Sequence, residues 1–122
     1  MVYFRIVFFV YDIPFSIFKA PTDPPSNLRN TGIAPSSMSF SWDDVPCGSR
    51  GGEITGYVYD LSSASNGDLV LSGTTSAANR FVMLSGLGQQ MPYDFRVAAV
   101  TSVGTGPYVS MAASTTGKRL LY

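Results

Sequence analysis

Apolar and polar side chains alternate one by one along most of the chain after Ser26. In the clearest stretch, single serines separate Met38, Phe40 and Trp42. Because successive side chains of a β-strand point to opposite faces, this period of two predicts a strand with one apolar and one hydroxyl-bearing face. Similar alternation, weaker towards the C-terminus, predicts further strands over residues 57–62, 69–74, 80–84, 93–100 and 108–115.

Residues that favour turns separate these stretches. Three glycines fall within residues 48–52, Asn66-Gly67 is a typical hairpin pair, and residues 104–107 read Gly-Thr-Gly-Pro. No stretch of ten or more residues shows the 3.6-residue period of an amphipathic helix. Six or seven short strands with turns between them predict an all-β fold, an antiparallel sandwich or barrel.

The N-terminal segment, residues 1–20, follows a different pattern. Residues 2–11 are apolar except for Arg5, and the acidic residue that follows ends the run. A membrane-spanning helix needs about 20 predominantly apolar residues, but only Ile6–Tyr11 lie between the two charges. The segment is therefore interpreted as an imperfect secretory signal peptide, an anchor, or a fragment of a neighbouring region. Phe18 stands where a signal peptide needs a small residue.

Three prolines within residues 21–25 divide the chain. They favour an extended, semi-rigid connector over a helix, so we expect a domain boundary at this point. Residues 21–116 then form one domain. Residues 117–122, which contain two basic side chains, are interpreted as a linker stub.

Composition narrows the chemistry that this domain can perform. The chain has 122 residues with 8 basic and 8 acidic side chains, no histidine and one cysteine. Without histidine, no Ser-His-Asp or Cys-His catalytic arrangement is available. With one cysteine, neither a disulfide within the chain nor a cysteine cluster for a metal can form. A net charge of zero does not favour nucleic-acid binding. We therefore expect no enzyme activity, no cofactor and no metal ion.

Three short motifs are candidates for a site. Cys47 is a candidate reactive thiol, half of an intermolecular disulfide, or an ordinary loop residue. Asp43-Asp44 is a candidate half of a cation site, but the dense acidic pattern of a calcium loop is absent, so solvated strand ends are the simpler interpretation. Asn66-Gly67-Asp68 lacks the cation of an adhesive Arg-Gly-Asp tripeptide and is explained as a hairpin turn.

The order and spacing of landmarks over residues 21–116 resemble a fibronectin type III domain. In chain order these landmarks are a proline-rich start running into Ser26-Asn27-Leu28, Trp42 at the end of a strand, Ile54-Thr55-Gly56-Tyr57, Leu87 six residues before Tyr93, the strand Tyr93–Ala99, and Gly104-Thr105-Gly106-Pro107. The resemblance implies a seven-stranded antiparallel sandwich of two sheets, of the immunoglobulin-like kind.

The resemblance also implies where individual side chains lie. The side chains expected in the structural core are Trp42, Tyr57, Leu87, Tyr93 and Phe95. Tyr93 resembles a tyrosine corner, whose buried hydroxyl bonds to nearby backbone. The loops of residues 43–53, 75–79 and 102–107 are expected at one end of the sandwich, where recognition usually occurs. The candidates for contact with a partner are Arg50, Phe81 and Tyr108.

For function, the resemblance implies a non-catalytic interaction and spacer module of a larger extracellular or cell-surface protein, of the adhesion or receptor kind. As a monomeric domain it would bind other proteins through its loops or sheet faces, and would bind no nucleic acid. It would reach a membrane only through other parts of the protein or the N-terminal segment. Two alternatives stay open. One is an accessory domain of a secreted or receptor-type enzyme whose catalytic part lies elsewhere, and the other is an intracellular, cytoplasmic scaffold module.

Overall fold

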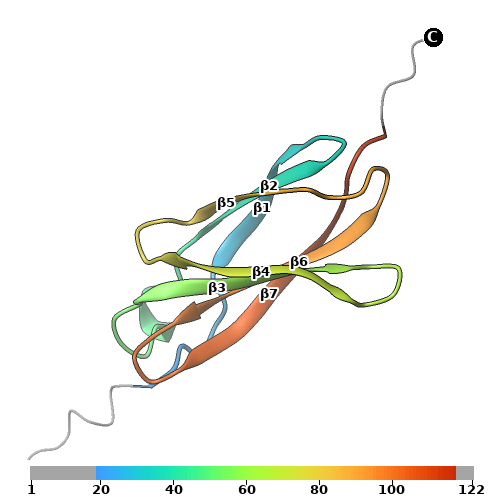
Figure 1. The fold of residues 1–122 in the computed structure, drawn as a ribbon. Coiled ribbons are helices and arrows are strands. Elements are labelled where there is room, and N and C mark those ends of the chain that lie inside the picture. Colours follow the sequence, from blue (N-terminus) through green and yellow to red (C-terminus); the bar gives the residue numbers. More distant parts are fainter. Residues whose placement is uncertain (1–18, 118–122) are drawn as a thin grey trace, which may run out of the picture.

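The computed structural model describes residues 19–117, which form two stacked β-sheets (Figure 1). The strands are β1 (Ser26–Ile33), β2 (Ser37–Asp43), β3 (Gly56–Ser63), β4 (Leu69–Ser76), β5 (Phe81–Ser85), β6 (Pro92–Val100) and β7 (Thr105–Ser114). A short 3-10 turn, η3 (Cys47–Ser49), lies between β2 and β3. The interpretations of the N-terminal segment and of the linker stub concern residues 1–18 and 118–122, which lie outside the described residues. Residues 19–117 include no helix that is long and apolar enough to cross a membrane.

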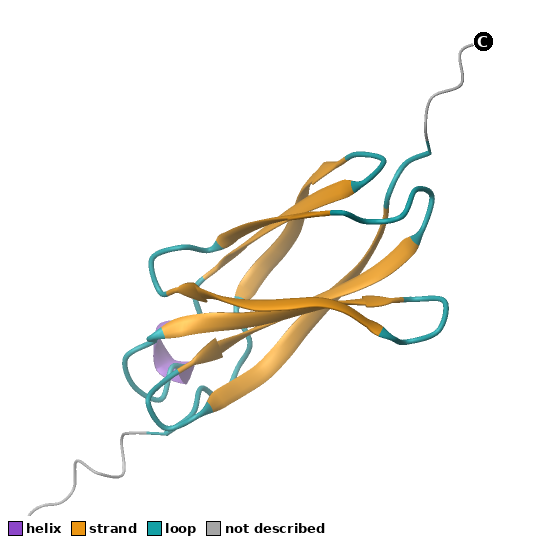
Figure 2. Cartoon of the chain, in the orientation of Figure 1, coloured by secondary structure: helices purple, strands orange, loops and turns teal. Residues whose placement is uncertain are grey.

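The two sheets are built entirely from antiparallel neighbours. One sheet has the strand order β1-β2-β5 and the other has the order β4-β3-β6-β7. Figure 2 shows the strands in orange and the loops that join them in teal. The prediction of a seven-stranded, two-sheet, all-β sandwich is therefore confirmed. β1 lies against β7 on one side of the sandwich, and β4 and β5 are the edge strands on the other side. The described chain begins at one end of the sandwich and finishes at the opposite end (Figure 1).

An aromatic cluster fills the space between the sheets. Phe40 on β2 stacks on Phe95 on β6 with ring centroids 4.2 Å apart, and Trp42 meets Tyr57 edge-on at 5.6 Å. The side chains that the sequence placed in the core are all buried in the structure: Trp42, Tyr57, Leu87, Tyr93 and Phe95. Each buried aromatic side chain removes roughly 150–250 Å² of surface from water, so this cluster supplies much of the hydrophobic stabilisation.

Tyr93 closes the end of the core away from Trp42. Its hydroxyl accepts a hydrogen bond from the Gly88 N–H at 2.9 Å, the local contact that a tyrosine corner makes. Thr115 secures the same corner, because its hydroxyl donates to the Gly88 carbonyl and accepts from the Met91 N–H at 3.0 Å. Both hydroxyls are thus paired, which avoids a cost of roughly 1–3 kcal/mol for a buried polar group without a partner.

The alternation of apolar and polar residues fails to predict one edge strand, β1, and the start of another, β7. Alternation alone does not predict β1, because most of its side chains are polar and Leu28 is the one that packs on the core. β7 begins at Thr105, within the Gly-Thr-Gly-Pro stretch that the pattern assigned to a turn. Since β7 is an edge strand, Pro107 can lie in it although proline has no N–H to donate.

Candidate interaction surfaces

The N-terminal pole is the end of the sandwich that carries residues 19–25 and the loops of residues 44–55, 77–80 and 101–104 (Figure 1). The sequence led us to expect these three loops at one end, and the topology places them there. β2, β4 and β6 run towards this pole and β3, β5 and β7 run away from it, so the three connections between them must cross it.

Residues 19–25 are hydrogen-bonded to the long loop of this pole. The Lys19 N–H donates to the Gly51 carbonyl at 2.9 Å, and the Thr22 N–H donates to the Ser49 carbonyl, also at 2.9 Å. Backbone groups therefore make both contacts, as they would between neighbouring strands. The segment that precedes β1 is fixed to the loop that follows β2.

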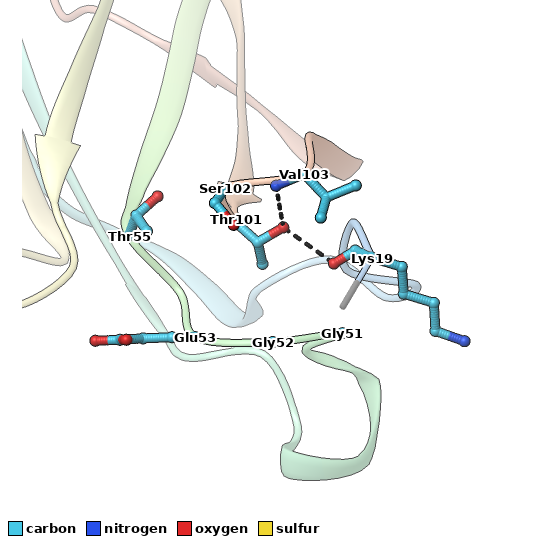
Figure 3. A pocket seen from close by; sticks show the side chains of 8 residues that line it. All are labelled: Lys19, Gly51, Gly52, Glu53, Thr55, Thr101, Ser102 and Val103. Carbon is cyan, nitrogen blue, oxygen red and sulfur yellow. Dashed lines mark hydrogen bonds between the residues drawn. The ribbon is translucent and has the colours of Figure 1, made fainter. Parts of the chain in front are cut away.

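The loop of residues 101–104 holds the same segment from the other side. The buried hydroxyl of Thr101 donates to the Lys19 carbonyl at 3.0 Å and accepts from the Val103 N–H at 3.3 Å (Figure 3). Pro21 is buried as well. The proline-rich segment is thus packed onto the domain, whereas its composition alone predicted an extended connector. The sequence prediction lacked the tertiary contacts with two loops that are distant along the chain.

A hollow of about 160 Å³ lies between these elements (Figure 3). Its wall consists mainly of backbone and small side chains, and the charged ends of Lys19 and Glu53 point away from it in opposite directions. Pockets for small molecules usually measure about 300–1,000 Å³ and are lined mostly by apolar side chains. At about 160 Å³, the hollow is smaller than such a pocket.

The close packing of residues 19–22 against the loop of residues 44–55 depends on Gly51. Its φ is +76°, and a Cβ at this position would lie 2.5 Å from the Lys19 carbonyl oxygen and 2.6 Å from that of Ala20. We expect Gly51→Ala to displace these residues from the pole and to cost about 1–2 kcal/mol in left-handed backbone strain. Amide hydrogen exchange followed by NMR should show faster exchange at Lys19 and Thr22.

Gly48→Ala is the matched control, because a Cβ at Gly48 in the same loop meets nothing within 4 Å. It should leave both amides protected. Unchanged protection of Lys19 and Thr22 in Gly51→Ala would contradict the proposed dependence.

The carboxylate of Asp43 is occupied by donors from β1. Asn27 Nδ2 donates to it at 2.8 Å, and Arg29 Nη1 lies at 3.4 Å. The hydrogen bond from Asn27, helped by the Arg29 guanidinium, lowers the pKa of Asp43 from its usual value. Asp43 ends β2 and its side chain is about half exposed, so it is a solvated strand end whose carboxylate is also paired with neighbours.

Asp44 is held by a different set of donors. The Tyr57 hydroxyl donates to Oδ1 at 2.9 Å, the Val45 N–H donates to Oδ1 at 2.7 Å, and Arg50 Nη2 forms an ion pair with Oδ2 at 3.2 Å. The two neighbouring carboxylates thus serve separate contacts. Over residues 19–117, no three histidine, cysteine, aspartate or glutamate side chains come together as metal ligands.

The three residues that we expected to contact a partner do not share a surface. Arg50 is bound to Asp44 and donates from Nε to the Val45 carbonyl at 3.0 Å, so it shapes its own loop. Phe81 is 45% exposed and lies on the outer face of the three-stranded sheet. Tyr108 is 37% exposed and lies on the outer face of the other sheet. A common site of all three is therefore excluded by their positions.

The outer face of the four-stranded sheet carries a cluster that the sequence analysis missed. Arg96 on β6 donates from Nε to both carboxylate oxygens of Asp60 on β3 at 2.9 Å. The guanidinium carbon of Arg96 also lies 4.0 Å from the centre of the Tyr108 ring. Their contact depends on a strand register that alternation does not specify.

The two remaining motifs lie in exposed loops. Cys47 begins η3 at the N-terminal pole and its side chain is an exposed free thiol. Asn66-Gly67-Asp68 forms the turn between β3 and β4, with a φ of +79° at Gly67. The hairpin predicted there is confirmed, and it lies at the end of the sandwich opposite the N-terminal pole (Figure 1).

Comparison with known sequences identifies similar proteins. The family model of the fibronectin type III domain matches residues 23–115. Receptor-type tyrosine-protein phosphatase F of mouse is 36% identical over 87 residues, which are 71% of this chain and 4% of that protein. The human netrin receptor DCC is 32% identical over 93 residues, 75% of this chain and 6% of the receptor. The chain thus spans only a small fraction of the length of these relatives.

Solved structures show the same similarity. The fn3 domain of the human collagen alpha-1(XX) chain superposes with a TM-score of 0.69 at 26% identity, covering 85% of this chain and 94% of that one. The FN1–FN3 domains of chicken CNTN1 give a TM-score of 0.68 at 22% identity, covering 80% of this chain and 33% of theirs. The second likeness shows a shared fold.

Proposed function

Because this chain belongs to the fibronectin type III family, we propose that it is a spacer and protein-binding module in the extracellular part of a cell-surface adhesion or receptor protein. Domains of this family are generally not catalytic, and the relatives that it matches are cell-surface receptors. The family alone does not fix a function. The proposal therefore rests on the geometry of the two ends.

The observation that carries the proposal is the position of these ends. The described chain begins at the N-terminal pole and finishes at the opposite end of the sandwich (Figure 1). A force or a distance transmitted along the chain therefore passes through the whole length of the domain. The hydrogen bonds of Lys19 and Thr22 fix the direction in which the preceding chain approaches the sandwich.

Partner contact is proposed at exposed aromatic side chains on the two outer faces. Phe81 and Tyr108 each present a half-exposed ring on a rigid strand. Tyrosine and arginine are over-represented at protein interfaces, and Tyr108 carries Arg96 on its ring. Arg50 contributes less to such a contact because its guanidinium is already paired with Asp44.

A second candidate function is favoured by the match to a receptor-type tyrosine-protein phosphatase. In such a protein the same module would be an accessory part of a receptor-type enzyme, with catalysis carried by another part. The role of the sandwich itself, to set a distance and bind proteins, would be unchanged.

A distance measurement across the full 122-residue chain tests the spacer proposal. One spin label is attached to the native Cys47 at the N-terminal pole, and a second to Thr116→Cys at the other end. Since β7 has 10 residues and a strand rises about 3.3 Å per residue, pulsed EPR should give one narrow distance near 35 Å, roughly the length of that strand. A broad distribution, or a distance of less than half that value, would refute a rigid spacer.

A further inference from the structure

The sandwich has four edge strands, and edge strands carry backbone N–H and C=O groups without a neighbour. Proteins usually protect such edges with charged side chains, prolines, bulges, short strands or a covering element, because an unprotected edge pairs with other strands. In the three-stranded sheet the edges are β1 and β5, and in the four-stranded sheet they are β4 and β7.

Three of these edges are protected. β1 carries Arg29 and has irregular register with β2 at two places, and it lies against β7. β7 contains Pro107 and has an irregularity opposite Ala98–Val100. β5 has only 5 residues. Each edge therefore has at least one recognised obstacle to strand addition.

β4 has no charge and no proline and is not short, and its one register irregularity lies at its start, next to the hairpin. Its 8 residues, Leu-Val-Leu-Ser-Gly-Thr-Thr-Ser, include no charged residue and no proline. It pairs regularly with β3 from Gly56↔Ser76 to Leu61↔Leu71, and the register is irregular only beyond that, next to the hairpin. Leu69 at its start is 62% exposed. The free side of β4 is long, regular and uncharged.

We propose that β4 pairs antiparallel with β4 of a second copy of this chain, so that two four-stranded sheets join into one continuous sheet. A second copy fits because an uncharged edge meets no like charges when it faces itself, and the chain has a net charge of zero. A two-fold axis makes both copies use the same surface. This proposal goes beyond the spacer function and departs from the monomer expected from the sequence.

The register of this contact is restricted by the pleat. The outer face of β4 carries Val70, Ser72, Thr74 and Ser76, and the residues between them face the core. A slip of one residue would therefore pair side chains of the outer face with side chains of the inner face. The permitted registers place Ser72 opposite Ser72 or opposite Thr74 of the second copy. Hydroxyl-bearing and β-branched residues then meet across the strands, and such pairs stabilise sheets.

Sedimentation of the full chain over a range of concentrations tests the proposal, with Thr74→Lys as the key variant. Thr74 is exposed, so the variant should fold, and its melting temperature checks this. The parent should form a reversible dimer at sub-millimolar concentration. Thr74→Lys should weaken dimerisation about tenfold, because the dimer then contains two like charges on a short interface.

Ala112→Lys is the matched control: it adds the same charge to the same outer face, but on β7, where it pairs with Asp94. It should leave the dimer unchanged. Hydrogen exchange should also show protection of residues 69–76 that rises with protein concentration.

Three results would overturn the proposal. The parent could remain monomeric at every concentration. Thr74→Lys could dimerise as well as the parent, which would place the contact elsewhere, for example at Phe81. Protection of residues 69–76 could be independent of concentration, which would assign the edge to a segment of the same chain.

Discussion

Replacing Trp42 by alanine is expected to lower the free energy of unfolding by about 3–5 kcal/mol. The indole is 1% exposed and lies with ring centroids 5.6 Å from Tyr57 and 6.1 Å from Phe95. Its removal leaves a cavity that two rigid sheets cannot close. Since domains are usually stable by only about 5–15 kcal/mol, the variant should retain a small part of its stability. Urea unfolding followed by circular dichroism measures the change.

One further variant at position 42 and one at an exposed ring test the role assigned to Trp42. The indole Nε1 is buried and donates to no acceptor among the described residues. Trp42→Phe removes this unpaired donor together with part of the surface, so its cost should fall clearly below that of Trp42→Ala. Phe81→Ala, at a half-exposed ring, should cost well under half as much as Trp42→Ala. Equal losses for Trp42→Ala and Phe81→Ala would refute the assigned core.

The second large effect is a loss of stability at alkaline pH caused by Tyr57. Burial, and then the hydrogen bond to Asp44, raises the pKa of Tyr57 from 10.0 to about 12. In the unfolded chain the phenol loses its proton at lower pH than in the folded protein, so folding is favoured less as pH rises. This contribution is complete below pH 10 and is lost between pH 10 and about 12. A fully shielded group would lose roughly 1.4 kcal/mol per pH unit. Because the hydroxyl of Tyr57 is only part-buried, we expect a smaller loss of about 1–2 kcal/mol.

Urea unfolding at several pH values between 9 and 12 measures this slope, with Tyr57→Phe as the control. Phenylalanine lacks the titrating group, so the variant should lose less stability over the same range. It should also be somewhat less stable than the parent at neutral pH, because Asp44 loses one of its donors. Parallel pH profiles for the two proteins would show that Tyr57 does not titrate as described.

The sequence predicted the central strands better than the edges, for a physical reason. β2, β3 and β6 each bury one face in the core, so their apolar residues recur with a period of two. β1 lies at an edge and is mainly polar, and Pro107 looked like a turn residue although an edge strand accepts it. Alternation reveals a strand when one of its faces is buried, and the edge strands β1 and β7 bury little side-chain surface.

The candidate surfaces were less predictable because they depend on contacts between distant residues. Nothing near Arg50 in the sequence shows that its guanidinium would pair with Asp44 rather than face a partner. The composition of residues 21–25 favoured a connector. The bonds of Lys19 and Thr22 to the loop of residues 44–55, and of Thr101 to Lys19, reveal a packed segment. The positive φ of Gly51 is the local feature that allows this approach.

The fluorescence of Trp42 reports directly on whether two β-sheets enclose this side chain. It is the only tryptophan of the chain, so the signal has one source. A buried indole without a hydrogen-bond acceptor should emit at clearly shorter wavelength than free tryptophan in water, and acrylamide should quench it weakly until urea unfolds the protein. Emission like that of free tryptophan, with strong quenching in the native protein, would contradict the sandwich and the spacer role built on it.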